Sequence, residues 1–389
     1  MRLSPVLGAM ATYPFVRLGE ARRAAEARGV DVIDFGIGEP REETPAFIRR
    51  ALAEAVEAEP VSSYPAADGL PETRAAIAAW AARRFGARLD PDTEVVPTLG
   101  SKEAVFALAQ VVGGPGATVV VPTPGYPVPA RGALFAGAEV VELPLRRAQG
   151  WLPDLDALPE RLDLLWLNHP HNPTGARAPL EFLARAAQEA VSRGFVLACD
   201  EAYSELWLDG DPPHSALELL DRRNLLVLNT LSKRSSMPGY RAGFAAGDPE
   251  LVAALKRYRP NAGVAPQAFV QRAAIAAWGD EAHVEEVRAR YRAKRDALLP
   301  ALMAAGLEPA GGDATFFLWL RAPERDDAAF AAALLDEHGI VVAPGSYLGA
   351  GGEGHVRVAL VPTVERCAEA AARLGGGPRP PGGPAPGPA

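Results

Sequence analysis

Length, composition and charge exclude several classes of protein at the outset. The chain has 389 residues, of which 48% are hydrophobic and 23% charged, with a formal net charge of −8 and a pI near 5.4. This length predicts two domains, the acidic balance argues against a nucleic-acid surface, and no apolar run approaches the roughly 18 residues of a membrane span. The two cysteines, Cys199 and Cys367, argue against a disulfide framework, so we expect a cytoplasmic protein.

The first part of the chain contains two turns that could face a ligand. Hydrophobic patterning predicts helices over 18–28, 45–58 and 71–85, and strands over 31–35 and 93–99. Gly36 and Gly38 follow the first of these strands, where they would let another molecule approach the backbone, although a plain turn accounts for them equally well. Gly100, Ser101 and Lys102 follow the second and open a helix, whose first backbone N–H groups form a natural anion site. Ser101 would cap this helix with or without a ligand.

The middle of the chain alternates strands with helices, which predicts an α/β fold with a mostly parallel sheet in three layers. The predicted strands cover 117–121, 162–167, 195–199 and 225–230. Soon after their ends come, in turn, Tyr126, Asn172, the pair Asp200 and Tyr203, and the pair Ser232 and Lys233. Ligands bind at the carboxyl edge of such sheets, so we expect these side chains to lie together there.

The stretch after the last of these strands suggests a particular cofactor. Lys233 is followed by Arg234 and Arg241, and these cations should disfavour its charged form and leave an amine able to attack a carbonyl. Ser232 and Arg241 suit an anion such as phosphate. A reactive amine beside a phosphate site suggests pyridoxal phosphate, whereas the stretch alone could equally be a solvated basic loop.

The rest of the chain predicts a smaller α+β domain. A long helical region covers 266–305, strands cover 315–320, 340–343 and 355–360, and helices cover 326–338 and the segment after the last strand. The run 375–389 is almost wholly Gly and Pro, so we expect a disordered tail. The predicted organisation is an arm with a small-domain segment (1–38), a large cofactor-binding domain (39–265), an interdomain helix with the small domain (266–374) and the tail.

Each functional group of pyridoxal phosphate can be paired with residues of this chain. Asp200 would keep the ring nitrogen protonated, Tyr203 and Asn172 would donate to the ring oxygen, and Tyr126 would stack on the ring. The phosphate would bind Ser232, Arg241 and the helix start at Gly100, Ser101 and Lys102. Lys233 would bind the aldehyde and then move the α-proton of the substrate.

An amino-acid substrate also needs a partner for its α-carboxylate. Arg357 lies in a short strand of alternating side chains, and its guanidinium fork would fit a carboxylate in a bidentate pair. The alternative is an ordinary arginine on a surface strand.

These motifs together resemble a known family. Asn172-Pro173-Thr174-Gly175, Asp200-x-x-Tyr203 and Ser232-Lys233 with Arg241-x-Gly243 are similar to the class I/II aminotransferases of the aspartate aminotransferase fold, the fold type I pyridoxal-phosphate enzymes, over nearly the whole chain except the tail. The resemblance implies a homodimer in which Tyr64 reaches the phosphate of the neighbouring subunit. It also implies that the backbone at Ile37 and Gly38 helps to hold the substrate carboxylate.

Several segments are most similar to the N-succinyldiaminopimelate aminotransferases. These segments are 100–106, 231–241, 258–261, 278–283 and 344–348. The resemblance implies transfer of an amino group from glutamate to the succinylated keto-precursor of diaminopimelate in lysine biosynthesis. We expect the distal carboxylate of this substrate to bind the arm around Tyr13 to Arg17, Lys102, Arg234 or the segment 259–261.

Other functions remain open on the sequence alone. Another aminotransferase, acting on aspartate, alanine or an aromatic amino acid, would share the same cofactor residues, and so would a pyridoxal-phosphate C–S β-lyase. A non-catalytic effector-binding module is disfavoured because no DNA-binding segment is apparent before residue 30. His169 and His171 depart from the usual residues of the family before Asn172, but no Cys or acidic pair accompanies them, so we expect no metal site.

Overall fold

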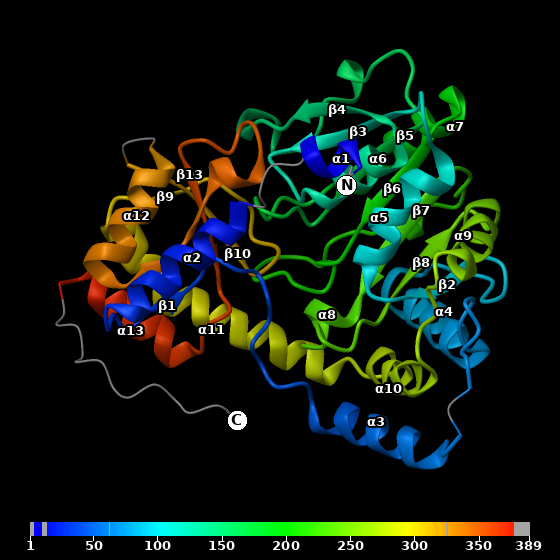
Figure 1. The fold of residues 1–389 in the computed structure, drawn as a ribbon, viewed down its shortest axis with the longest axis horizontal. Helices are drawn as coiled ribbons and strands as arrows, with labels where there is room; N and C mark the ends of the chain where they lie inside the picture. Colours follow the sequence, from blue (N-terminus) through cyan, green and yellow to red (C-terminus); the bar gives the residue numbers. More distant parts are fainter. Residues whose placement is uncertain (1–3, 10–13, 62, 324–325, 377–389) are drawn as a thin grey trace.

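A seven-stranded mixed sheet forms the centre of the larger domain in the computed structural model, which describes residues 4–9, 14–61, 63–323 and 326–376 (Figure 1). The strand order is β2-β8-β7-β6-β5-β3-β4. The strands are β2 (Val95–Thr98), β3 (Thr118–Thr123), β4 (Glu139–Pro144), β5 (Leu164–Asn168), β6 (Val196–Asp200), β7 (Leu225–Thr230) and β8 (Gly243–Gly247). Only β8 runs antiparallel to its neighbours, so β3 to β7 all end at the same edge.

Helices cover both faces of this sheet, as expected for strands that are apolar on both sides. Within β7, Leu225 and Val227 face one helical layer and Leu226 and Leu228 face the other, because successive side chains of a strand point in opposite directions. The first layer contains α4 (Pro71–Phe85), α7 (Leu180–Arg193) and α10 (Ala268–Trp278). The second contains α5 (Ser101–Val112), α6 (Val128–Ala136) and α9 (Pro249–Asn261). The predicted three-layer α/β architecture is therefore confirmed.

The smaller domain is built on a four-stranded antiparallel sheet, at the left of Figure 1. The strand order is β12 (Ala343–Pro344), β13 (His355–Ala359), β10 (Phe317–Arg321) and β9 (Glu308–Pro309). A parallel pair, β1 (Ile33–Asp34) and β11 (Ile340–Val341), lies beside it. The helices near these sheets are α2 (Pro14–Ala27), α11 (Ala282–Ala304), α12 (Asp327–His338) and α13 (Val364–Leu374), and α1 (Pro5–Ala9) precedes them.

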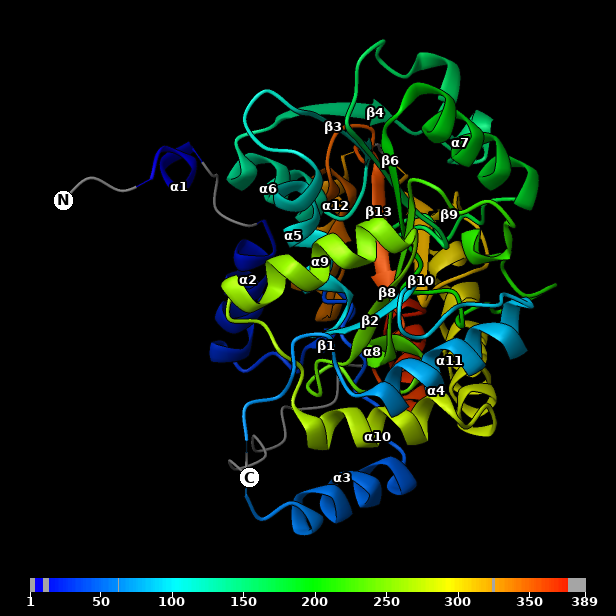
Figure 2. The same cartoon turned by 90° about the vertical axis from the view of Figure 1, so that its right-hand side faces the viewer.

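The structure differs from the sequence-based expectation in one helical region and in three strands, β4, β8 and β9, that were not predicted. The region 266–305 is not one helix but two, α10 and α11, separated at 279–281. α3 (Ala46–Ala58) packs against α10 at the bottom of the view in Figure 2. Among the unpredicted strands, the sequence of β8, Gly-Phe-Ala-Ala-Gly, resembles a loop. A Cβ atom at Gly243 would lie 2.5 Å from the Asn229 carbonyl oxygen and 3.0 Å from the Ser101 nitrogen, so this position needs glycine for close packing.

The remaining expectations concern the C-terminal tail, the domain limits and membrane spans. The predicted tail falls outside the described residues from residue 377 onward, and the domain limits drawn from the sequence stay a prediction. Among the described residues, no helix has both the length and the apolar character needed to cross a membrane.

Candidate active site

A cavity of about 410 Å³ opens where β5, β6 and β7 end, between the large and the small sheets. Its volume falls in the range of small-molecule and cofactor pockets. It brings together most of the site residues predicted from the sequence: Gly38, Ser101, Lys102, Tyr126, Asn172, Asp200, Tyr203, Ser232, Lys233, Arg241 and Arg357. Gly100 and Tyr64 do not line this cavity.

Lys233 enters the cavity from α8 (Leu231–Arg234), a short helix that begins directly after β7. Thr230 caps α8, because its side chain accepts a hydrogen bond from the Ser232 N–H. The Lys233 amine donates to the Gly38 carbonyl oxygen at 2.9 Å. Burial lowers the pKa of Lys233 from 10.5 to about 8; the charges of Arg357 and Arg241 add to this effect, and those of Glu39 and Asp200 oppose it. A much larger fraction of this amine than of an ordinary lysine is therefore neutral, and nucleophilic, near neutral pH.

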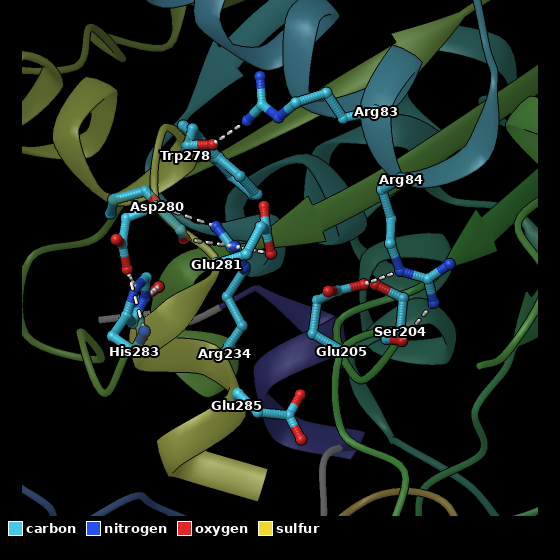
Figure 3. A network of polar contacts seen from close by, with 12 residues as sticks. Arg83, Arg84, Ser204, Glu205, Arg234, Trp278, Asp280, Glu281, His283 and Glu285 are labelled. Atoms are coloured by element: carbon cyan, nitrogen blue, oxygen red, sulfur yellow. Dashed lines mark hydrogen bonds and ion pairs between the residues drawn. The ribbon is translucent and has the colours of Figure 1, made fainter. Parts of the chain in front are cut away.

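Arg234 does not act on Lys233 in the way expected from the sequence. Successive residues of a helix point about 100° apart, and Arg234 is directed away from the cavity. Figure 3 shows its guanidinium in a separate polar network, where it donates to the carbonyl oxygens of Ala277 (3.0 Å) and Asp280 (3.3 Å) and pairs with Glu281 (2.9 Å). Its side chain is 1% exposed. The prediction that Arg234 lowers the pKa of Lys233 is wrong, because burial is the main cause and Arg241 and Arg357 are the cations that contribute.

Asp200, the last residue of β6, lies buried at the floor of the cavity. One carboxylate oxygen accepts the backbone N–H of Ala202 at 3.1 Å, and the Asp200 carbonyl oxygen accepts from the Asn168 side chain at 2.8 Å. Burial raises the pKa of Asp200 to about 6, although the Ala202 N–H and the charge of Lys233 oppose this shift. A cation beside this carboxylate would lower the pKa again, so the site favours a positively charged partner for Asp200.

Two phenols flank the same space. Tyr203 is buried against the rings of Phe316 and Phe317, each with its centroid 5.6 Å away. Burial raises the pKa of Tyr203 far above its ordinary value, so its hydroxyl stays protonated and can donate a hydrogen bond. Tyr126 follows β3 and lines the cavity with an aromatic ring that can stack on a planar ligand.

One end of the cavity is suited to a phosphate. Ser101 is the first residue of α5, and the N-cap residue is Gly100, which has no side chain to bond the first N–H groups. The prediction that Ser101 caps this helix is therefore wrong. Arg241 donates to the carbonyl oxygens of Leu99 (3.1 Å) and Pro238 (2.9 Å), which fix its guanidinium beside this helix start. A Cβ at Gly100 would lie 2.7 Å from the Arg241 Nη2 atom. Gly100 therefore acts behind the cavity wall, by making room for Arg241.

Another part of the cavity is suited to a carboxylate. Arg357 lies on β13 and is 4% exposed, which excludes the alternative of an ordinary surface arginine. Its guanidinium donates to the Asn172 side-chain oxygen at 3.0 Å and to the Gly36 carbonyl oxygen at 2.8 Å. The ring of Phe317 lies 4.4 Å from it and that of Phe15 5.1 Å. These contacts hold the planar fork in one orientation.

Comparisons with known proteins agree with this geometry. Residues 30–374 match the family model "Aminotransferase class I and II". The chain belongs to this family. It is 38% identical to an LL-diaminopimelate aminotransferase of Dehalococcoides mccartyi over 97% of this chain and 99% of that protein. An aminotransferase structure from Neisseria meningitidis aligns with a TM-score of 0.88 at 36% identity, covering 96% of this chain and 99% of that one. An aspartate aminotransferase mutant from Thermus thermophilus aligns with a TM-score of 0.89 at 30% identity, with the same two coverages.

The donor set fits the cofactor of class I and II aminotransferases, pyridoxal phosphate. The cavity has an amine of lowered pKa, a buried carboxylate, a protonated phenol donor and a cationic helix start among its lining groups. These are the groups needed for an aldehyde, a protonated ring nitrogen, a ring oxygen and a phosphate.

Several lining residues were not selected from the sequence. Asn168, Thr230 and Phe317 all line the cavity, and Glu39 does so beside Gly38. Asn168 and Thr230 are the last residues of β5 and β7, as Asp200 is of β6. A polar residue at the end of a predicted parallel strand is the signal that could have identified them.

The cations proposed for a distal carboxylate are mostly placed elsewhere. Arg259 is fully buried and pairs with Glu103 at 3.3 Å, and Arg234 is held in the network of Figure 3. Neither lines the cavity, so these two expectations are wrong. Tyr13 lies outside the described residues, while Lys102 does line the cavity.

His169 and His171, before Asn172, are both buried. Among the described residues, no group of three or more His, Cys, Asp or Glu side chains is placed to hold a metal ion.

Proposed function

We propose that this aminotransferase transfers the amino group of a diaminopimelate substrate to a 2-oxo acid such as 2-oxoglutarate, in lysine biosynthesis. The observation that carries this proposal is the 38% identity, over nearly the full length of both chains, with a protein named LL-diaminopimelate aminotransferase. The sequence resemblance suggested the N-succinylated form, whereas the Dehalococcoides mccartyi relative is named for LL-diaminopimelate. We therefore propose LL-diaminopimelate as the preferred substrate, with N-succinyl-LL-diaminopimelate as the first competitor to measure.

The arrangement of the cavity supports a role for each residue. Ser101, Ser232 and Arg241 would hold the phosphate of pyridoxal phosphate, with the start of α5. When bound, this cofactor supplies an electrophilic aldehyde and a ring that accepts electrons. Asp200 would keep a proton on the ring nitrogen, because a buried carboxylate is most stable beside a cation.

The remaining residues would act on the substrate. Arg357 and Asn172 would orient its α-carboxylate, which fixes the Cα–H bond relative to Lys233. The Lys233 Nζ atom, neutral once it is released from the aldehyde, would take the α-proton and return it. Tyr203 would donate to the ring oxygen, and Tyr126 would stack on the ring.

We also propose that the enzyme works as a homodimer. The support is the family resemblance together with the side chain of Tyr64, which is fully exposed and outside the cavity of its own chain. A hydroxyl in such a position is available to the phosphate site of a second copy. Sedimentation of the purified protein tests this directly, and a monomer that retains full activity would contradict it.

Steady-state assays with 2-oxoglutarate test the substrate. We expect kcat/KM for LL-diaminopimelate to exceed that for aspartate, alanine or an aromatic amino acid by about a thousandfold, because buried polar groups without a partner cost several kcal/mol. Lys102→Met should lower kcat/KM for diaminopimelate by a larger factor than that for alanine, which has no distal group. Aspartate as the best donor would refute the substrate assignment while leaving the cofactor chemistry in place; the Thermus thermophilus neighbour makes it the main alternative.

A further inference from the structure

A second, much smaller cavity lies next to Asp200. Its volume is about 20 Å³, and it shares Tyr126, Asn168 and Asp200 with the active-site cavity as lining residues. Asp200 therefore separates the two spaces. A cavity of this size with several polar groups in its walls is large enough to hold one water molecule.

The walls of the small cavity carry the polar groups that a buried water needs. Besides Asp200 and Asn168, they include His171 and Trp166. The indole N–H of Trp166 is buried and has no hydrogen-bond partner among the described residues. Leaving such a donor unpaired in the interior is costly, so an acceptor within this cavity would be stabilised.

The contacts of His171 allow the tautomer in which Nε2 carries the proton. The Thr174 hydroxyl oxygen accepts the N–H of Ala176 at 3.4 Å and lies 2.8 Å from the His171 Nδ1 atom. When the hydroxyl donates its hydrogen to Nδ1, the imidazole proton lies on Nε2, which can then donate. A Cβ built on Gly125, another lining residue, would lie 3.8 Å from that Nε2 atom. Burial lowers the pKa of His171 well below its ordinary value, so the ring stays neutral with this single proton.

We propose that His171 is a positioning residue for Asp200, joined to its carboxylate through one water molecule in the small cavity. The water accepts hydrogen bonds from His171 Nε2–H and from the Trp166 indole, and it donates one to the Asp200 carboxylate. A water is required because the His171 ring makes no direct hydrogen bond to Asp200 among the described residues. This inference rests on the proposed function, in which Asp200 faces the ring nitrogen of the cofactor.

The water-mediated contact between His171 and Asp200 would help to keep the Asp200 carboxylate ionised. Burial raises the pKa of this carboxyl to about 6 even though the Ala202 N–H and the charge of Lys233 lower it, and this value is close to the pH at which the enzyme must keep it ionised. A hydrogen bond donated to the carboxylate stabilises the ionised form and opposes that shift. His169 provides a matched control, because its buried ring packs against His171 (centroids 5.9 Å apart) and Phe182 but does not line the small cavity.

The first test is a high-resolution crystal structure of the wild-type holoenzyme. We expect one ordered water within hydrogen-bond distance of the His171 Nε2 atom, the Trp166 indole nitrogen and the Asp200 carboxylate. A dry cavity, or a direct contact between His171 and Asp200, would overturn the inference. This readout needs no variant and does not depend on activity.

The second test compares His171→Leu, His171→Gln and His169→Leu in the holoenzyme. We expect His171→Leu to lower kcat about tenfold with little change in KM, and to shift the pH titration of the bound cofactor's absorbance by about one unit. His171→Gln keeps an N–H donor near the Nε2 position, so its kcat and its cofactor titration should both be close to those of the wild type. His169→Leu should leave both unchanged.

Two comparisons decide the outcome. Equal behaviour of His171→Leu and His169→Leu would overturn the inference. If His171→Leu fails to fold, Thr174→Val replaces it, since it removes the hydroxyl that contacts His171 Nδ1; an unchanged titration of the bound cofactor in that variant would then overturn the inference. Asp200→Asn separates this inference from the proposed function. If Asp200→Asn has a strongly reduced kcat and His171→Leu a normal one, only the role of His171 is refuted. If Asp200→Asn has a near-normal kcat, the role of Asp200 itself is refuted, and with it the water-mediated contact to His171.

Discussion

Replacing Arg357 by lysine is expected to damage substrate recognition without disturbing the cofactor. The guanidinium is fixed by hydrogen bonds to Asn172 and Gly36 and lies 4.4 Å from the Phe317 ring. Lysine keeps the charge but can present only one donor direction to a carboxylate, so one of two charge-assisted hydrogen bonds is lost. Such a bond contributes about 1.5–3 kcal/mol, which corresponds to a loss in kcat/KM of about tenfold to 150-fold.

The assay is a single-turnover measurement with two substrates, one amino acid and the matching amine without its α-carboxylate. Arg357→Lys should lower the rate for the amino acid and leave the rate for the amine nearly unchanged, with unaltered affinity for pyridoxal phosphate. Arg321→Lys is the matched control, because Arg321 lies on the neighbouring strand β10 and pairs with Glu308 at the surface. Equal losses for both substrates, or a loss within twofold for the amino acid, would refute the assignment of Arg357.

Three further outcomes are expected. Asp200→Asn should lower kcat by at least about tenfold to a hundredfold and change KM much less, because the ring nitrogen loses the charge that keeps its proton; near-normal kcat would show that another group holds the ring. Arg234→Leu should destabilise the fold by about 3 kcal/mol in urea denaturation, because two buried carbonyl oxygens lose their donor, whereas Arg223→Leu at an exposed ion pair should have little effect. In cofactor-free protein, the rate of cofactor uptake should rise with pH, with its midpoint near pH 8, and level off above that pH, since only the neutral Lys233 amine reacts; a rate still rising beyond pH 10 would contradict the lowered pKa of Lys233.

Much of the large domain was predictable because its strands are apolar on both faces. The run 225–230 was predicted residue for residue, since a continuous apolar segment that ends in polar residues is typical of a buried parallel strand. The convergence of Asn172, Asp200 and Lys233 followed from topology, because all parallel strands present their carboxyl ends at one edge. β8 was missed because small residues serve close backbone packing there and leave no apolar pattern.

The orientation of side chains was less predictable than their position. Lys233 and Arg234 are neighbours in sequence, but a helical turn sends one into the cavity and the other into the network of Figure 3, where His283 also links Ser235 (2.9 Å) and Asp280 (2.6 Å). Sequence proximity of charges therefore gave the wrong cause for the lowered pKa of Lys233. The small cavity beside Asp200 has no sequence signal, because it arises from packing between segments far apart in the chain.

The assignment of Lys233 as the residue that binds the cofactor is tested most directly by chemical trapping. The purified holoenzyme is treated with borohydride, digested and analysed by mass spectrometry. We expect the reduced cofactor on the peptide that contains Lys233, and no label in Lys233→Ala. Lys102 is the other lysine that lines the cavity, so a label on its peptide, with Lys233 unmodified, would contradict this assignment.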